Sequence, residues 1–293
     1  MNSANNAAVV VGVDGSEPAL SAVRLAATEA ARQHRPLRVV HGFIWPLLRV
    51  PVSPAPDAPP GGGLRHRAEE LVEAAVNEAE ATAPGLSISG EIIDGEAAAV
   101  LVGESPSAAL IVLGDRGLGG FSALVVGSVA VQVAAYADCP VLVARGTQRP
   151  DQPVLVAVDG SDASRRAADV AAETAVSLGV PLVAVHAYQH PGSSGPGEMQ
   201  PLVYDEAKLH REQERTLAGW LTGLTEDHRG LRLTCQATRG RPGTVLAEAS
   251  RSAQLAVVGG RGRGEVTGLL LGSVSQSMLH HAHCPVMVVR APH

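Results

Sequence analysis

Lysine is almost absent from this chain of 293 residues. Of its 23 basic residues only Lys208 is a lysine, and it follows an alanine. The chain therefore has no Gly-Lys-Ser/Thr phosphate loop, in which a lysine reaches the terminal phosphates. It also has no lysine of the protein-kinase type on an early strand. Any binding of phosphate must rely on backbone amides and arginine.

Aromatic residues, cysteines and excess positive charge are scarce as well. Aromatics make up 2% of the chain and the formal net charge is −6. The low aromatic content argues against surfaces on which bases could stack, and the negative net charge argues against electrostatic binding of nucleic acid. No nucleic-acid partner is therefore expected. The three cysteines, Cys139, Cys235 and Cys284, are sparse and odd in number, which does not suit a disulfide framework.

Long uninterrupted apolar runs are also missing. The most apolar stretch, residues 123–144, contains Ser128, Gln132, Asp138 and Pro140, so no membrane span is expected. The N-terminal sequence MNSANNAAVVVGVDGS has no basic region ahead of its apolar run, unlike a signal peptide. By elimination we expect a cytoplasmic protein.

What the chain does contain is a long internal repeat. Hydrophobic residues make up 45% and charged residues 18%, as in globular proteins, and the length suits about two domains of roughly 150 residues. Residues 9–16 (VVVGVDGS) return as residues 154–161 (VLVAVDGS), and the same offset relates every later block, up to CPVLVAR and CPVMVVR. The sequence predicts two copies of one domain, residues 1–146 and 147–293, joined at the polar segment GTQRPDQP.

Hydrophobic periodicity in each half indicates strands that alternate with helices. Short apolar runs at 9–13 and 110–113 suit buried parallel strands, and residues 17–34 repeat apolar positions at spacings of three and four, as a helix does. This alternation predicts an α/β fold with two tandem open parallel five-stranded sheets, each flanked by helices. Segments 46–63 and 190–201, rich in Pro, Gly and Ser, are predicted to be long loops. In the second half one long helix is expected to bury Leu217, Trp220, Leu221 and Leu224.

A glycine pattern after the fourth strand of each half is the main indication of chemistry. It is Gly-x2-Gly-x9-Gly-Ser, starting at Gly114 and again at Gly259. Glycine lets the backbone approach a ligand closely, and turn amides form an anion-binding nest. The following helix start adds a hydroxyl, free amides and the positive end of the helix dipole, which together suit a triphosphate. The alternative is a plain turn and helix cap, because duplication alone would also preserve the glycines.

The second element of the site is the tripeptide Asp-Gly-Ser that begins at Asp14 and again at Asp159, between the first strand and the first helix. As a helix cap it would contribute roughly 1 kcal/mol. As a carboxylate at the carboxyl edge of an open sheet, it would lie where α/β folds bind ligands. There it could meet a ribose hydroxyl or a phosphate-bound Mg²⁺. The two interpretations are compatible.

Together these motifs resemble the universal stress protein family, in its ATP-binding branch. The resemblance rests on VGVDGS and VAVDGS, VLGDRG and VVGGRG, GSVA and GSVS, and the complete glycine spacing in both halves. It covers nearly the whole chain as a tandem pair. It implies a Rossmann-like strand order of 3-2-1-4-5, which makes strands one and four neighbours, and ATP, with or without Mg²⁺, as the ligand.

The resemblance carries over to matching positions in both halves. The glycine loop and the following helix would hold the phosphates, and the ends of strands one and two would lie near the adenine. In the first half the implied residues are Gly12, Asp14, Val40, Gly114, Asp115, Arg116, Gly117, Leu118, Gly119, Gly120, Gly127, Ser128 and Val129, with His41 beside Val40. In the second half they are Ala157, Asp159, Val185, Gly259, Gly260, Arg261, Gly262, Arg263, Gly264, Glu265, Gly272, Ser273 and Val274, with His186 beside Val185.

Two departures set the second half apart. Ala157 stands where the first half has Gly12, which would tighten the adenine pocket. Glu265 replaces Gly120, which would place a carboxylate near the phosphates. The second site is therefore the weaker candidate.

The segment HHAHC, which ends at Cys284, resembles a set of metal ligands, but only its cysteine recurs in the first half, as Cys139. The helix dipole explains histidines at a helix end, and zinc needs three or four converging ligands, so no metal site is expected. Both cysteines precede a proline that opens a buried strand, and core packing is their expected role. His41 and His186 are expected to be near-core histidines rather than catalytic bases.

No residue that would position a water, and no arginine finger, is evident, although fast phosphoryl transfer depends on such groups. We therefore assign no catalytic residue and expect a nucleotide-dependent stress-response module with slow or no hydrolysis. A slow ATPase or nucleotidyl transferase, and a scaffold that binds no nucleotide, are the alternatives. The resemblance also implies pairing through the fifth strand, either in a homodimer or within the chain as a pseudo-dimer.

Overall fold

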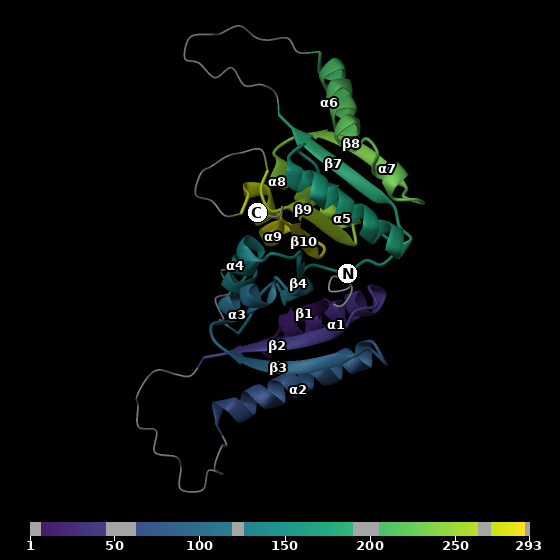
Figure 1. Ribbon diagram of the computed structural model, residues 1–293. Helices are drawn as coiled ribbons and strands as arrows, with labels where there is room; N and C mark the ends of the chain where they lie inside the picture. Colours follow the sequence, from purple (N-terminus) through teal and green to yellow (C-terminus); the bar gives the residue numbers. More distant parts are fainter. Residues whose placement is uncertain (1–6, 45–62, 119–125, 190–204, 263–270, 291–293) are drawn as a thin grey trace, which may run out of the picture. The chain divides into compact units, whose positions relative to one another are not determined.

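The chain folds into two compact units, Met1–Ala144 and Arg145–His293, and each is described by itself (Figure 1). The predicted loops at 46–63 and 190–201 lie outside the described residues, apart from Gly63 at the start of a helix. The computed structural model describes residues 7–44, 63–118, 126–189, 205–262 and 271–290.

The first unit is an open parallel sheet with helices on both faces. Its strands pair in the order β3-β2-β1-β4-β5, and every pairing is parallel. The predicted fold class and the strand order 3-2-1-4-5 are therefore confirmed for this unit. Its elements are β1 (Ala8–Gly12), α1 (Glu17–Arg32), β2 (Leu37–Phe43), α2 (Leu64–Thr82), β3 (Ile88–Asp94), α3 (Ala97–Glu104), β4 (Ala108–Gly114), α4 (Ser128–Tyr136) and β5 (Val141–Ala144).

The second unit repeats this plan with two additions, the short helix α7 and a 3₁₀ turn. Its parallel strands pair in the order β8-β7-β6-β9-β10. Its elements are β6 (Val154–Ala157), α5 (Asp162–Leu178), β7 (Leu182–Tyr188), α6 (Glu206–Trp220), α7 (Leu224–Asp227), β8 (Leu233–Arg239), α8 (Pro242–Ala249), the 3₁₀ turn η2 (Ser250–Ser252), β9 (Leu255–Gly259), α9 (Ser273–His281) and β10 (Val286–Val289).

The central strands form the core of each unit because both of their faces are covered. Every residue of β1 and of β5 is buried, which explains why these strands are continuous apolar runs rather than alternating ones. Helix α1 lays a stripe of small residues against the sheet, with Ala22, Val23, Ala26, Ala27 and Ala30 all inaccessible to solvent. Alanine allows close approach of a helix to a sheet, so the core is tightly packed although large side chains are few.

Strand alternation decides which side chains of β2 reach which helix layer. Arg38 bonds Glu104 of α3, and a Cβ added to Gly42 would point at Ala97, the first residue of α3. On the other face, a Cβ added to Gly90 of β3 would meet Val72 of α2. The even-numbered positions of β2 therefore face α3, and this is the side on which the candidate site lies.

The predicted long helix of the second unit was wrong in two respects. Leu217, Leu221 and Leu224 are buried as expected, but Trp220 is only partly buried. Helix α6 ends at Trp220, and Leu224 begins the separate helix α7. Between them Gly223 adopts φ 88°, in the left-handed region that glycine enters at little cost. The apolar spacing continues through this break, so periodicity alone could not reveal it. None of the helices in the described ranges is both long and apolar enough to cross a membrane.

Candidate functional site

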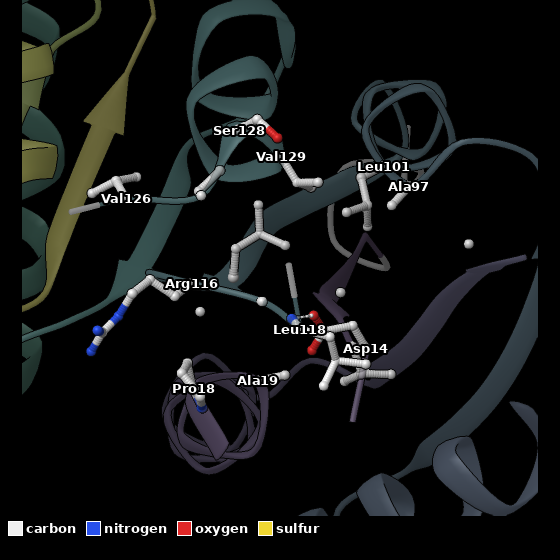
Figure 2. Close-up of a pocket in the computed structure, with 18 of the residues that line it drawn as sticks. Asp14, Pro18, Ala19, Ala97, Leu101, Arg116, Leu118, Val126, Ser128 and Val129 are labelled. Atoms are coloured by element: carbon white, nitrogen blue, oxygen red, sulfur yellow. Dashed lines mark hydrogen bonds between the residues drawn. The ribbon is translucent and has the colours of Figure 1, made fainter. Parts of the chain in front are cut away.

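The first unit has a cavity of about 670 Å³ at the carboxyl ends of β1, β2 and β4. The starts of α1, α3 and α4 complete its wall, as Figure 2 shows. Strand β1 lies between β2 and β4. The connection from β1 leads to β2 on one side of it, and the chain later returns to place β4 on its other side. This is the topological switch point at which open α/β sheets bind ligands.

Most of the predicted first-half residues lie in this wall, including Asp14 and the start of the glycine loop. Asp115 lies beside the cavity rather than in its wall, and positions 119 and 120 are outside the described residues. The predicted residues that line the cavity are Gly12, Asp14, Val40, Gly114, Arg116, Gly117, Leu118, Gly127, Ser128 and Val129.

Sequence reasoning missed further wall residues that come from elements remote in the chain. Pro18 and Ala19 enter from α1, and Ala97 and Leu101 enter from α3. For one missed residue a signal existed: Gly42 lies two positions after Val40 and so shares its face of the strand. The helix residues carried no comparable signal, because their position depends on how α3 packs on the sheet.

Asp14 connects the start of α1 to the glycine loop. Its Oδ1 accepts bonds from the Ser16 amide at 3.0 Å and from the Ser16 hydroxyl at 2.6 Å. Its Oδ2 accepts the Leu118 amide at 2.9 Å (Figure 2). Ser16 itself caps α1 by accepting the Ala19 amide at 3.3 Å. The capping and the ligand-facing interpretations are thus both compatible with this geometry, but Ser16 is the cap.

At two of the pattern glycines a Cβ would collide with a neighbouring atom, and at the third it would not. A Cβ on Gly117 would lie well inside 3.0 Å of Asp14 Oδ2, and a Cβ on Gly114 would lie 2.7 Å from the carbonyl of Pro18. At Gly127 the nearest atom would be 3.6 Å away, an ordinary van der Waals distance. The first two glycines therefore let the loop lie close to α1, whereas at Gly127 the described residues leave room for a side chain.

The anion-binding end of the cavity is formed by backbone at the start of α4. Its N-cap is Gly127, which has no side chain to satisfy the first amides of the helix, whereas α1 is capped by Ser16. The Gly127 amide bonds the carbonyl of Asp115 at 2.7 Å and so holds the helix start against the loop. Uncapped amides at a helix start, together with the positive end of the helix dipole, form a site for an anion.

Arg116 does not reach into the cavity with its charge. Its side chain is exposed, its Nε lies 3.7 Å from Asp115 Oδ1, and Figure 2 shows the guanidinium pointing away from Asp14 and Leu118. Among the described wall residues the ionisable ones are Asp14 and Arg116. The described wall therefore offers an anion backbone amides rather than a side-chain cation.

The second unit has a smaller cavity, of about 190 Å³, at the matching place. Asp159 again accepts the Ser161 amide at 3.0 Å and its hydroxyl at 2.6 Å, and a Cβ on Gly262 would again collide with Asp159 Oδ2. Gly260 lies outside the wall, and positions 263–265, with the predicted Glu265, are not among the described residues. The predicted residues that line it are Ala157, Asp159, Val185, Gly259, Arg261, Gly262, Gly272, Ser273 and Val274.

The two strand-end histidines have structural partners. Nδ1 of His41 lies 2.8 Å from the Val13 carbonyl oxygen, and Nδ1 of His186 lies 2.9 Å from that of Val158. His186 also packs edge-on against Trp220, with ring centroids 4.9 Å apart. Each histidine ties the second strand of its unit to the end of the first, which agrees with the near-core interpretation.

The histidine-rich helix end is organised by arginine. The Arg145 guanidinium donates to the carbonyls of Met278, Leu279 and His280 at the end of α9. It therefore supplies hydrogen-bond donors for carbonyl groups in the last turn of this helix. Within the described ranges no group of three or more His, Cys, Asp or Glu side chains is placed to hold a metal ion.

Cys139 and Cys284 are buried, as core packing requires, and burial raises the pKa of each thiol to about 12. Thiols of such high pKa are poor nucleophiles and poor metal ligands near neutral pH.

Comparison with known proteins agrees with this architecture. The universal stress protein family matches residues 6–145 and again residues 152–290. A universal stress protein of Mycobacterium tuberculosis H37Rv is 36% identical over 290 residues, which cover 96% of each protein. One from Mycolicibacterium smegmatis is 34% identical over 305 residues and covers 99% of each.

Among solved structures, the crystal structure of a universal stress protein from Archaeoglobus fulgidus is similar in fold, with a TM-score of 0.69 at 20% identity over 98% of each chain. The family models match almost the whole of both halves, and curated relatives share more than a third of their residues with this chain. The resemblance that the motifs indicated is confirmed: the chain belongs to the universal stress protein family and carries two domains of it in tandem.

Proposed function

We propose that this protein binds ATP in the crevice where β1 meets β4 and acts as a nucleotide-dependent stress-response module rather than as an enzyme. One observation carries the proposal: a cavity of about 670 Å³ joins an apolar end, at β1 and β2, to the uncapped start of α4. Small-molecule pockets usually enclose roughly 300–1,000 Å³ and combine an apolar wall with a few polar groups. A nucleotide has the matching form, with a flat base at one end and phosphates at the other.

The three parts of ATP have separate partners in this proposal. The base would lie against Gly12, Val40 and Leu101, where the wall is apolar. The phosphates would meet the amides of the glycine loop and of the first turn of α4, together with the Ser128 hydroxyl. Asp14 already accepts three hydrogen bonds of the roughly four that a carboxylate can accept, which leaves one for a ribose hydroxyl. A bound Mg²⁺ would then be held chiefly by the phosphates.

Slow or absent hydrolysis follows from the same wall. Asp14 is the single carboxylate among its described residues, and it is engaged with Ser16 and Leu118 rather than placed to activate a water. Arg116 points outward. Without a base for the water and a cation on the transferred phosphoryl group, the barrier to phosphoryl transfer stays high. A slow ATPase or a nucleotidyl transferase is the competing activity.

The proposal is tested on the full chain. Heat-denatured protein should release ATP or ADP into the supernatant, which chromatography identifies, and nucleotide-stripped protein should give heat on titration with ATP. In single-turnover mixing, a binding module should form essentially no ADP on the timescale of binding, whereas an enzyme should. Absence of calorimetric heat with folded, stripped protein would refute ATP binding. Light scattering tests the homodimer or pseudo-dimer that the resemblance implies.

A further inference from the structure

The two crevices are built from the same positions, and their phosphate ends are alike. The Gly127 amide bonds the carbonyl of residue 115 at 2.7 Å, and the Gly272 amide bonds that of residue 260 at 2.8 Å. Both α4 and α9 have a glycine N-cap, and both loops have a glycine packed against an aspartate. Among the described residues, this end differs at Val126, which lines the larger cavity and corresponds to the buried Leu271, which lies outside the wall of the smaller one. The cavity volume is about 670 Å³ in the first unit and about 190 Å³ in the second.

The substitution that the sequence singled out is partly compensated. A Cβ on Gly12 would lie 2.6 Å from Cδ2 of Leu113 and 2.8 Å from Cδ1 of Leu101. The second unit has Ala157 at this position, Val258 in place of Leu113 and Leu246 in place of Leu101. One carbon is gained on β6 and one is lost on β9, so the contact between these strands is relieved, whereas the contact with the facing helix is not.

Two serines of the second wall also leave the cavity largely unaffected. Ser164 replaces Ala19, and Ser275 replaces Ala130. The Ser164 hydroxyl donates to the Ser161 carbonyl at 2.9 Å, and the Ser275 hydroxyl donates to the Gly259 carbonyl at 2.6 Å. Both hydroxyls are therefore turned onto the backbone of their own unit.

Two further differences between the described walls lie together at the base end. Gly42 is replaced by Ala187 at the end of the second strand, and Ala97 is replaced by Pro242 at the start of the facing helix. These two positions touch: a Cβ on Gly42 would lie 2.7 Å from the Cα of Ala97 and 3.1 Å from its nitrogen. The second unit places extra carbon atoms on both sides of this contact, while Leu246 keeps the place of Leu101.

We infer that Gly42 and Ala97 select the first unit as the one that admits the purine, and that Ala187 and Pro242 exclude the purine from the second unit. The chain then holds one ATP rather than two. The inference rests on the proposed function and adds to it the residues that determine which repeat is occupied. About 190 Å³ lies below the usual range for small-molecule pockets, whereas about 670 Å³ lies well within it.

The backbone dihedral angles of both units allow these residues to be exchanged. Position 97 is the first residue of α3, where proline is well tolerated, and Pro242 already occupies the first position of α8. The backbone at Gly42 is not in the left-handed region, so alanine meets no barrier from its own dihedral angles. Its methyl would lie 2.7 Å from the Cα of Ala97, so the start of α3 must shift to admit it. The reverse changes, Ala187→Gly and Pro242→Ala, only remove atoms.

The test compares the wild type with a closed variant (Gly42→Ala, Ala97→Pro) and an opened variant (Ala187→Gly, Pro242→Ala), each as the full chain. Calorimetry should give one equivalent of ATP for the wild type, at least a tenfold loss of affinity for the closed variant, and two equivalents for the opened one. Affinity for inorganic triphosphate, which has no base, should be the same in the closed variant as in the wild type. Thermal melts establish folding, and the opened variant suffices if the closed one does not fold.

Two equal ATP sites in the wild type would overturn the inference while leaving the proposed function intact. An unchanged stoichiometry in the opened variant, or equal losses of ATP and triphosphate affinity in the closed one, would also overturn it. Absence of ATP binding in all three proteins would instead refute the proposed function itself.

Discussion

Gly117→Ala is the substitution that most directly tests the site geometry. A methyl at this position would lie well inside 3.0 Å of Asp14 Oδ2, closer than real Cβ atoms come to other heavy atoms. The loop is held by the Leu118 amide, which is bonded to that same oxygen, so the loop cannot move away without breaking the bond. We expect the Asp14 carboxylate to swing aside and the Leu118 amide to lose its acceptor.

The size of the effect follows from that one bond. A hydrogen bond to a charged group contributes about 1.5–3 kcal/mol. Because Leu118 is 70% exposed, water can replace part of the interaction, and the lower end of that range applies. About 1.4 kcal/mol corresponds to a tenfold change in an equilibrium constant. We therefore expect ATP affinity of the first unit to fall about tenfold, and Gly117→Glu, which adds charge near the phosphates, to abolish it.

Calorimetric titration with ATP measures the loss, and a double-mutant cycle with Asp14→Ala assigns its cause. If the methyl acts by displacing Asp14, adding Gly117→Ala to Asp14→Ala should cost little more. Gly103→Ala is the matched control, because a Cβ there meets nothing within 4 Å. Wild-type affinity in Gly117→Ala, or losses that simply add in the cycle, would show that the contact between Gly117 and Asp14 does not organise the site.

Three further predictions concern stability and reactivity. Gly219→Ala, whose Cβ would meet no atom within 4 Å inside helix α6, should stabilise the protein by about 0.5–1 kcal/mol, seen as a higher Tm; a lower Tm would contradict this. Ser16→Ala removes the cap of α1 and should lower the free energy of unfolding by about 1 kcal/mol in urea titrations; no change would refute the capping role. At pH 8 Ellman's reagent should modify the partly exposed Cys235 well before Cys139 or Cys284, and equal rates would contradict their burial.

The buried thiols also predict a pH dependence. Burial raises the pKa of Cys139 and Cys284 from 9.0 to about 12, so the unfolded chain loses these protons first as pH rises. Their contribution to stability is complete below about pH 9 and is lost as pH rises towards 12. Denaturation midpoints measured from pH 8 to pH 11 should therefore fall less in a variant with alanine at both positions; an identical fall would count against this explanation.

Several features of the site could be predicted because they depend on residues close together in sequence. The capping of α1 requires only Ser16 and its neighbours, and the uncapped start of α4 follows from a glycine that precedes Ser128. One longer-range feature, the strand order that the family resemblance implied, places the end of β1 beside the end of β4 and so brings Asp14 to the glycine loop. These features need no knowledge of how helices pack.

Other features depended on contacts across the fold and could not be foreseen. Ala157 was expected to narrow the second cavity, and its effect depends both on Val258 on the neighbouring strand and on Leu246 of the facing helix. Arg116 was a candidate cation, yet its side chain leaves the cavity. Gly42 is a strand glycine of no evident role until the start of α3 is seen to lie against it.

The sequence alone determined the duplication, the order of strands and helices along the chain, the family and the backbone character of any phosphate site. The repeat offset, the hydrophobic period and the lack of lysine can all be read from the order of residues, without knowing which residues touch. Only the tertiary structure decided which glycines are sterically required, what Asp14 holds, and why the two crevices differ in volume. The physical reason is that close packing depends on contacts between residues far apart in the chain, such as Gly42 and Ala97, and the sequence does not show which residues touch.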